Sequence, residues 1–254
     1  MLAHLYPHRP IILGHRGASA DAPENTLAAF RLALAQGADG VELDVTLSSD
    51  GVPVVIHDDT VDRTTNGTGR VATRTLAQLK QLDAGYATKF GGKFAGERIP
   101  TLAEALAELG QRAFINIELK RDPSPDQGLA QRVVALIHDQ QVSERVLLSS
   151  VYYANLQRVK ALDATLPVGL LYDPSAPARM MRAWLTPGVR AEAHHPHHSL
   201  FNAVTRGAYR ARGLRVNVWT VNAEADLRRL MRLGVDGIIT DKPEFVIRLL
   251  RRAD

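Results

Sequence analysis

The sequence predicts an α/β protein folded as a (β/α)8 TIM barrel, on three observations. Short apolar, strand-like runs alternate with segments of helical periodicity along almost the whole chain. Eight such strand–helix units fit into the 254 residues, which is the usual length of this barrel. Two helix-to-strand junctions, residues 37–41 (GADGV) and 234–238 (GVDGI), also resemble each other, as expected of a repeated unit. A doubly wound sheet is the alternative arrangement of the same units.

The strands are expected to be short and apolar, and most are followed by a helix. The strands begin near Ile11, Val41, Ala113, Val146, Pro167, Val189, Arg215 and Gly237. The helical period covers residues 24–36, 101–109, 127–140, 152–162 and 224–233. Glycines 37, 110, 213 and 234 stand where helices commonly end. Thr101 and Glu104 have the spacing of a capping box, which predicts a helix start.

One interval is longer than the others. The expected strands at Val41 and Ala113 are about 72 positions apart, against roughly 22 to 33 elsewhere. A hairpin turn at residues 49–51 opens this interval, and residues 76–80 predict one short helix. We therefore expect a single domain over residues 1–254 with an insertion subdomain at about 59–100. Loops at the carboxyl ends of barrel strands carry function, so the insertion is expected at the catalytic mouth.

Composition excludes some classes of site. The chain has no cysteine, which rules out disulfides and thiolate chemistry and fits a cytoplasmic location. The N-terminal residues lack the apolar segment of a signal peptide, and no run reaches the roughly 20 apolar residues of a membrane span. The net charge of +4 favours anionic partners only mildly. Basic patches interleaved with aromatic residues are missing, which argues against nucleic-acid binding.

Three acidic side chains form the candidate metal site. Glu42 and Asp44 are two apart on an expected strand, so their carboxylates share one face, and Glu118 repeats the pattern on the next strand. Burying carboxylates together is costly unless a cation neutralises them. Oxygen-only ligands favour Mg²⁺ or Ca²⁺ over Zn²⁺. The alternative is a structural ion-pair network with Arg16 and Lys120.

Two histidines and two cations complete the candidate catalytic set. His15 and His57 both stand at strand ends, and imidazole can act as base or acid near neutral pH. Arg16 can bind two phosphate oxygens at once through its guanidinium group, and Lys120 can bring a positive charge to a bridging or departing oxygen. Asn25 precedes the first helix and is either its N-cap or a functional residue.

Two further features have open interpretations. Trp219 ends the seventh expected strand and is either a wall of the substrate pocket or a core residue. Residues 194–198 (HHPHH) lie at the end of the sixth strand and could line the mouth, hold a second metal or simply pack.

Together these motifs resemble the glycerophosphodiester phosphodiesterase family over about residues 11–248. The resemblance is carried by residues 15–17 (HRG), 23–26 (PENT), 40–45 (GVELDV), 57–58 (HD), 118–120 (ELK), 219–222 (WTVN) and 237–243 (GIITDKP). It implies a TIM barrel with a small insertion and hydrolysis of a glycerophosphodiester to glycerol 3-phosphate and an alcohol. It also implies that Glu42, Asp44 and Glu118 bind one divalent ion.

The resemblance further implies that His15 and His57 are the acid–base pair and that Arg16 and Lys120 hold the phosphate. Attack by the substrate's own glycerol hydroxyl, through a cyclic phosphate, and direct attack by water are both open. A diesterase acting on lysophospholipids and a non-catalytic phosphate-binding barrel are rival functions. The sequence leaves the oligomeric state undetermined.

Overall fold

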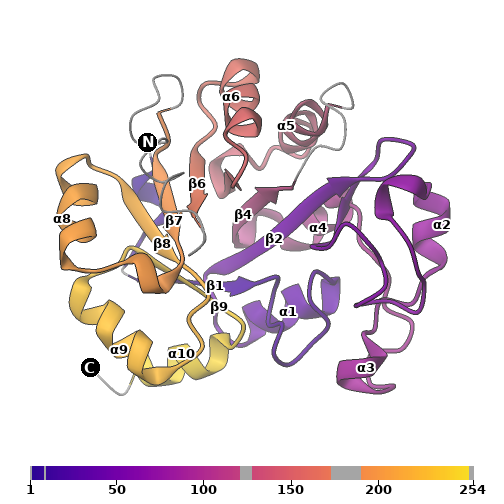
Figure 1. Cartoon of the computed structure of the whole chain (residues 1–254), viewed down its shortest axis with the longest axis horizontal. Helices are drawn as coiled ribbons and strands as arrows, with labels where there is room; N and C mark the ends of the chain where they lie inside the picture. The colour runs from indigo at the N-terminus through magenta and orange to yellow at the C-terminus, as the bar shows by residue number, and fades with distance from the viewer. Residues whose placement is uncertain (1, 9, 121–127, 173–189, 252–254) are drawn as a thin grey trace.

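The protein is described by a computed structural model over residues 2–8, 10–120, 128–172 and 190–251 (Figure 1). In these residues nine strands form one sheet, whose order is β1-β9-β8-β7-β6-β5-β4-β2-β3. The strands are β1 (Ile11–His15), β2 (Gly40–Leu47), β3 (Pro53–Val55), β4 (Phe114–Leu119), β5 (Val146–Ser150), β6 (Val168–Tyr172), β7 (Ala193–Pro196), β8 (Arg215–Val218) and β9 (Gly237–Thr240). Because β1 pairs with both β2 and β9, the eight parallel strands close into a barrel. The barrel prediction is confirmed, and the doubly wound alternative is wrong.

Helices surround this barrel (Figure 1). They are α1 (Leu27–Ala35), α2 (Leu76–Gln81), α3 (Ala87–Phe90), α4 (Leu102–Leu109), α5 (Leu129–Asp139), α6 (Tyr153–Leu162), α8 (Ala203–Ala211), α9 (Glu224–Leu233) and α10 (Pro243–Leu250). The expected capping box at the start of α4 is confirmed, because the Thr101 side chain accepts from the Glu104 N–H and Glu104 accepts from the Thr101 N–H. Within the described residues, no helix combines the length and the apolar character needed to cross a bilayer.

The first residues of one strand and one helix differ from those expected from the sequence. The sixth barrel strand was expected near Val189 but begins at Ala193. Residue 189 itself lies outside the described residues, as does Gln127, where the helix over 127–140 was expected to begin. Helix α1 begins at Leu27 rather than Glu24, because Thr26 is its N-cap and accepts from the Ala29 N–H. The backbone φ of Asn25 is 57°, so the chain turns sharply before the helix and Asn25 is not the cap.

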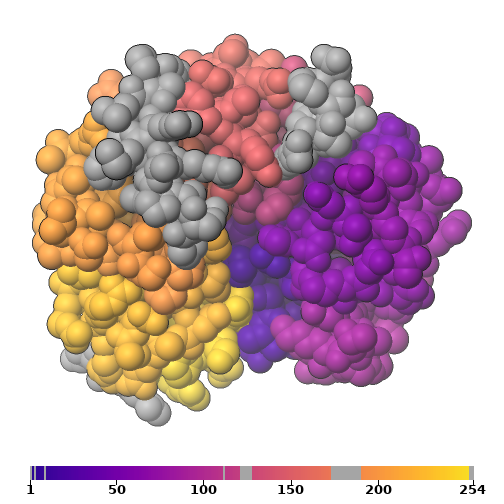
Figure 2. Space-filling model, in the orientation of Figure 1, coloured from indigo at the N-terminus to yellow at the C-terminus, as the bar shows by residue number. Residues whose placement is uncertain are grey.

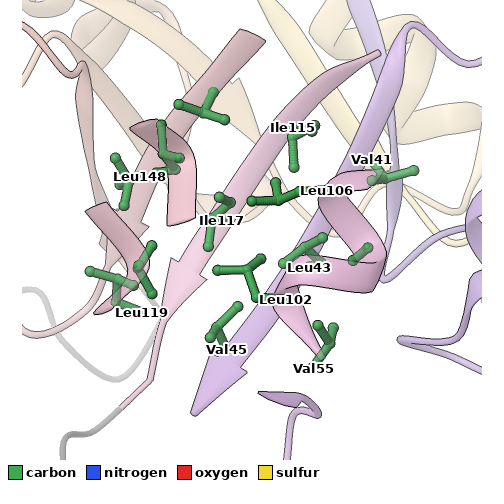
Figure 3. Close-up of a cluster of buried hydrophobic side chains, with 14 of the residues drawn as sticks. Val41, Leu43, Val45, Val55, Leu102, Leu106, Ile115, Ile117, Leu119 and Leu148 are labelled. Atoms are coloured by element: carbon green, nitrogen blue, oxygen red, sulfur yellow. The ribbon is translucent and has the colours of Figure 1, made fainter. Parts of the chain in front are cut away.

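Strands β2 and β4 show why the acidic residues enter the barrel. Val41, Leu43 and Val45 point outward and pack under α4 with the alternate residues of β4 (Figure 3). Side chains alternate between the two faces of a strand, so Glu42 and Asp44 face the barrel interior. The expectation that both carboxylates share one face is thus confirmed, because the residues that alternate with them all pack in the hydrophobic core. At Gly40 a Cβ atom would lie 1.8 Å from the Phe114 oxygen, so only glycine permits this close pairing.

The segment between β2 and α4 forms its own layer beside the barrel (Figure 1). As expected, β3 runs antiparallel to β2 after the turn at residues 49–51. The segment holds α2 and α3 and packs a separate apolar cluster, whose buried members are Val54, Ile56, Val61, Val71, Leu79, Ala84 and Ile99. This arrangement places His57, just after β3, beside the carboxyl end of β2.

The barrel interior below the acidic residues holds buried polar side chains among apolar ones. His195 on β7 is fully buried, with Asn116 Nδ2 3.4 Å from its Nδ1 and Asn217 Nδ2 3.1 Å from its Nε2. Its neighbour His194 is also buried, and its Nδ1 lies 2.8 Å from the Tyr172 hydroxyl. Burial lowers the pKa of His195 to about 3 and that of His194 to about 4. Both imidazoles are therefore neutral parts of the packing.

Because His194 and His195 are buried as neutral imidazoles, the free energy of unfolding is expected to fall in acid. The folded-state pKa of each lies below the ordinary value near 6.5, so below pH 6.5 the unfolded chain binds more protons than the folded protein. Between pH 7 and pH 5 each group should remove roughly 2 kcal/mol from the free energy of unfolding. Urea unfolding at both pH values should show a smaller loss for His195→Gln than for the wild type. An equal loss in both would contradict the prediction, and His138→Gln, at an exposed position, is the control.

Candidate active site

The candidate residues converge at the carboxyl ends of the barrel strands. A cavity of about 200 Å³ lies there, lined by His15, Arg16, Glu42, His57, Asn116, Glu118, Lys120, Val151, Leu171, Trp219 and Ile239. Figure 2 shows a hollow in the middle of the visible face, with indigo N-terminal residues at its floor. The purple segment that holds the insertion borders it on one side and the orange C-terminal half on the other. Of the candidate metal ligands, acid–base histidines and phosphate-binding cations, Asp44 alone is not part of the lining, and it is buried.

The three carboxylates form one cluster. Oxygens of Glu42, Asp44 and Glu118 lie within 4.8 Å of one another, and all three side chains are buried. Lys120 Nζ lies 3.1 Å from Asp44 Oδ1 and 3.0 Å from Glu118 Oε1. Arg16 Nε is 3.3 Å from Asp44 Oδ2. The ion-pair network that was the alternative to a metal site is therefore present around Asp44 and Glu118.

The positive charges of Arg16 and Lys120 do not neutralise all three carboxyl groups of the cluster. Burial raises the pKa of all three carboxyls, but for Asp44 the charges of Lys120 and Arg16 outweigh it and the pKa falls well below its usual range. The pKa of Glu118 stays raised, at about 7, through burial and despite Lys120. The pKa of Glu42 is raised well above its usual value by burial and by its two acidic neighbours. A cation among these oxygens would relieve that cost, so the donor set fits a hard divalent ion.

His15 is fixed by a carboxylate behind it. Its Nδ1 lies 2.7 Å from Asp241 Oδ1, and Asp241 also accepts from the Ser19 hydroxyl and the Asn222 amide. Burial alone would raise the pKa of Asp241, but these bonds lower it to about 2. The ionised carboxylate can only accept, so Nδ1 carries the proton. Nε2 is left toward the cavity, 4.0 Å from Glu42 Oε2.

His57 has the same arrangement on the other side. Its Nδ1 lies 2.6 Å from Asp58 Oδ1. Burial would raise the pKa of Asp58, but bonds from Arg63 and His57 lower it to about 2. Burial lowers the pKa of His57 itself. The imidazole is thus held with Nε2 unprotonated near neutral pH, which is the state of a base.

Arg63 connects the two sides of the site. Its Nε donates to Asp58 Oδ2 at 2.7 Å, and its Nη1 and Nη2 donate to the two oxygens of Glu24 at 2.7 and 2.8 Å. Glu24 in turn accepts from Arg16 Nη1 at 2.7 Å. One guanidinium from the insertion therefore orients both the carboxylate behind His57 and the carboxylate behind Arg16.

Trp219 and residues 194–198, the histidine tract, have different surroundings. The Trp219 ring lines the cavity, and its Nε1 donates to the His195 carbonyl at 2.8 Å. Residues 194–198 are not among the lining residues. In the described chain the acidic trio is the group with metal-ligand geometry, and the tract contributes no second one. The pocket interpretation of Trp219 and the packing interpretation of His194 and His195 agree with these positions.

Sequence reasoning did not select the residues that hold the candidates in place. Asp241, Asn222, Glu24 and Arg63 were not site candidates, although Asp241 follows β9 directly and so carried the same strand-end signal as His15. Asn25 is a site neighbour rather than a cap: its Nδ2 donates to Asp44 Oδ2 at 2.8 Å. Strand-end position, applied to all eight strands, would have found Asp241; nothing in the local sequence marks Arg63.

Comparison with known proteins identifies the family of the chain. The model of the glycerophosphoryl diester phosphodiesterase family matches residues 15–245. The chain belongs to this family. It is 43% identical over 247 residues to a glycerophosphodiester phosphodiesterase of Caldanaerobacter subterraneus, covering 96% of this chain and 99% of that one. It is 34% identical to a Bacillus subtilis enzyme of the same name, covering 94% of this chain and 86% of the other.

A solved structure extends the likeness to the fold. The phosphodiesterase of Oleispira antarctica superimposes with a TM-score of 0.88 at 34% identity, covering 97% of this chain and 99% of that chain. That structure is a complex with the product sn-glycerol 3-phosphate. Membership of the glycerophosphoryl diester phosphodiesterase family makes the protein a phosphoric diester hydrolase. The rival interpretation as a non-catalytic barrel is therefore wrong.

Proposed function

We propose that the enzyme hydrolyses deacylated phospholipids, such as glycerophosphocholine or glycerophosphoethanolamine, to glycerol 3-phosphate and an alcohol. The observation that carries the proposal is the meeting of two imidazoles, two cations and a buried acidic cluster at one cavity of about 200 Å³. Pockets for drug-sized ligands begin at about 300 Å³, so this lining suits a compact glycerophosphate group. The product held by the Oleispira antarctica protein is of the same class.

The proposed cofactor is one Mg²⁺ or Ca²⁺ held by Glu42, Asp44 and Glu118. When bound, it would neutralise the cluster and polarise a phosphoryl oxygen as a Lewis acid. Arg16 and Lys120 face the same cavity and would bind the remaining phosphate oxygens, which fixes the phosphorus near the two imidazoles. Trp219 would pack against the alkyl part of the substrate.

The imidazoles would move the protons. One histidine takes the proton from the glycerol hydroxyl, whose oxygen attacks phosphorus, while the other gives a proton to the leaving alcohol oxygen. The cyclic glycerol phosphate is then opened by water with the two roles reversed. Because His15 and His57 each have Nδ1 held by a carboxylate, both present Nε2 to the reaction. Direct attack by water is the alternative, and it predicts that a substrate analogue lacking the attacking hydroxyl is still hydrolysed.

The test begins with protein stripped by a chelator. Glycerol 3-phosphate release from glycerophosphocholine and glycerophosphoethanolamine, and choline release from lysophosphatidylcholine, would be followed while Mg²⁺, Ca²⁺ or Mn²⁺ is added back. We expect release from the two deacylated substrates only in the presence of a cation. Choline release from lysophosphatidylcholine at a higher kcat/KM would favour the lysophospholipid alternative. The cytoplasmic location and the division into one domain with an insertion stay predictions.

Arg63→Gln is predicted to lower kcat with little change in melting temperature. The change removes the bonds to Glu24 and Asp58 but leaves Arg16 and His57 in place, so their orientation loosens and kcat should fall about 10- to 100-fold. Arg63→Lys keeps the charge without the fork and should recover only part of the rate. Arg31→Gln, which breaks the Arg31–Glu108 ion pair elsewhere on the surface, is the matched control. An unchanged kcat in Arg63→Gln would contradict this positioning role.

A further inference from the structure

A second cavity lies at the opposite end of the barrel from the candidate active site. Its volume is about 550 Å³, and it is lined by Pro10, Arg206, Arg210, Gly213, Leu214, Arg215, Met231, Gly234, Val235 and Asp236. These residues come from the segments just before β1 and β9, the start of β8, and the facing parts of α8 and α9. The cavity therefore sits at the amino ends of the strands, where none of the catalytic candidates lies.

The cavity carries an excess of positive charge. Arg206 and Arg210 stand one turn apart on α8, and among the described residues neither side chain makes an ion pair or hydrogen bond. The Nε of Arg206 is buried without an acceptor. The acidic residue of the lining, Asp236, is already engaged: Arg215 Nη1 lies 2.9 Å from its Oδ1, and the Val216 N–H donates to its Oδ2 at 2.9 Å.

This arrangement is unfavourable while the cavity holds only water. Like charges at positions i and i+4 of a helix repel each other. The Nε of the half-buried Arg206 has also lost its hydration without gaining an acceptor, whereas Arg210 is exposed. An anion between Arg206 and Arg210 would remove both costs. Arginine forks match the oxygens of phosphate or carboxylate, and buried donors strengthen such bonds.

The other walls indicate what kind of anion fits. Leu214, Met231 and Val235 give the same cavity an apolar side. A volume of about 550 Å³ is in the range of pockets for small organic ligands and far exceeds the need of a bare phosphate ion. We propose that this cavity is a second binding site, for an organic phosphate monoester whose phosphate pairs with Arg206 and Arg210 and whose apolar part packs on Leu214 and Met231.

Calorimetric titration can separate this site from the catalytic one. Adenosine monophosphate, inorganic phosphate and adenosine would be titrated into the full chain in chelator, with Arg16→Gln as the background that weakens phosphate binding at the catalytic cavity. We expect saturable binding of adenosine monophosphate, tighter than that of inorganic phosphate and retained in Arg16→Gln. The double variant Arg206→Gln/Arg210→Gln should weaken it at least about tenfold.

The control is the double variant Arg248→Gln/Arg251→Gln, which removes the same net charge from exposed positions of α10 and the residue after it. It should bind as the wild type does. Equal weakening in both double variants would mean that only net charge matters and would overturn the proposal, as would the absence of saturable binding. Binding of inorganic phosphate as tightly as adenosine monophosphate would overturn the role given to the apolar side. Thermal unfolding of each variant checks that the fold is intact.

Discussion

Replacing His57 by alanine is expected to lower kcat by about 10²- to 10⁴-fold, the usual contribution of a positioned acid–base group. The imidazole is held by Asp58 with its Nε2 toward the cavity, and alanine leaves no group there to carry a proton. His57 is only partly buried and packs in no apolar cluster, so the variant should fold. His15→Ala should have a loss of similar size, because Asp241 presents His15 in the same way. Glycerol 3-phosphate release under single-turnover conditions is the measurement.

A substrate with a different leaving group can show which of His15 and His57 is the general acid and which is the general base. A glycerophosphodiester with an activated phenolic leaving group needs no proton donor when its bond breaks. The variant that lacks the general acid should therefore recover most of its rate on this substrate, whereas the variant that lacks the base should not. His138→Ala, which removes an exposed imidazole of α5 paired with Asp163, controls for loss of any histidine. Wild-type turnover by either His15→Ala or His57→Ala would remove that residue from the mechanism.

The acidic cluster was predictable because it depends on local periodicity. In β2, apolar and acidic residues alternate, and the apolar set must face the helices. This fixes Glu42 and Asp44 in the interior before any coordinates are known. Glu118 follows from the same rule in β4, whose register pairs it with Asp44. In a closed barrel, neighbouring strands bring such residues to one depth, so two short strand motifs sufficed to assemble the trio.

The residues that orient the site could not be found this way. His15 and Asp241 are 226 positions apart, and only the pairing of β1 with β9 brings them together. Arg63 lies in an irregular segment, where no periodicity indicates the direction of a side chain. The histidine tract was open to three interpretations for a related reason: a histidine that packs and one that binds a metal look alike in sequence. Burial beside two asparagines decides the case for His195.

Glu118→Gln is expected to abolish most activity while stabilising the metal-free protein at high pH. The folded-state pKa of Glu118, about 7, lies above the ordinary value of 4.5, so its contribution to stability is lost as pH rises through that interval. At pH 8 the metal-free wild type should be less stable than metal-free Glu118→Gln by roughly 3 kcal/mol, and at pH 5 the difference should be small. With Mg²⁺ or Ca²⁺ added, kcat of the variant should be about 10²- to 10³-fold lower.

Thermal and urea unfolding with and without the cation test whether the cluster is a metal site or only an ion-pair network. A ligand that binds the folded state alone stabilises it in proportion to its occupancy, so the cation should stabilise the wild type far more than Glu118→Gln. If Lys120 and Arg16 already balanced the cluster, removing one carboxylate would destabilise the protein at every pH, because Lys120 would lose a partner. Equal stabilisation of both proteins by the cation would exclude Glu118 as a ligand. The opposite signs expected at pH 8 distinguish the two cases in a single comparison.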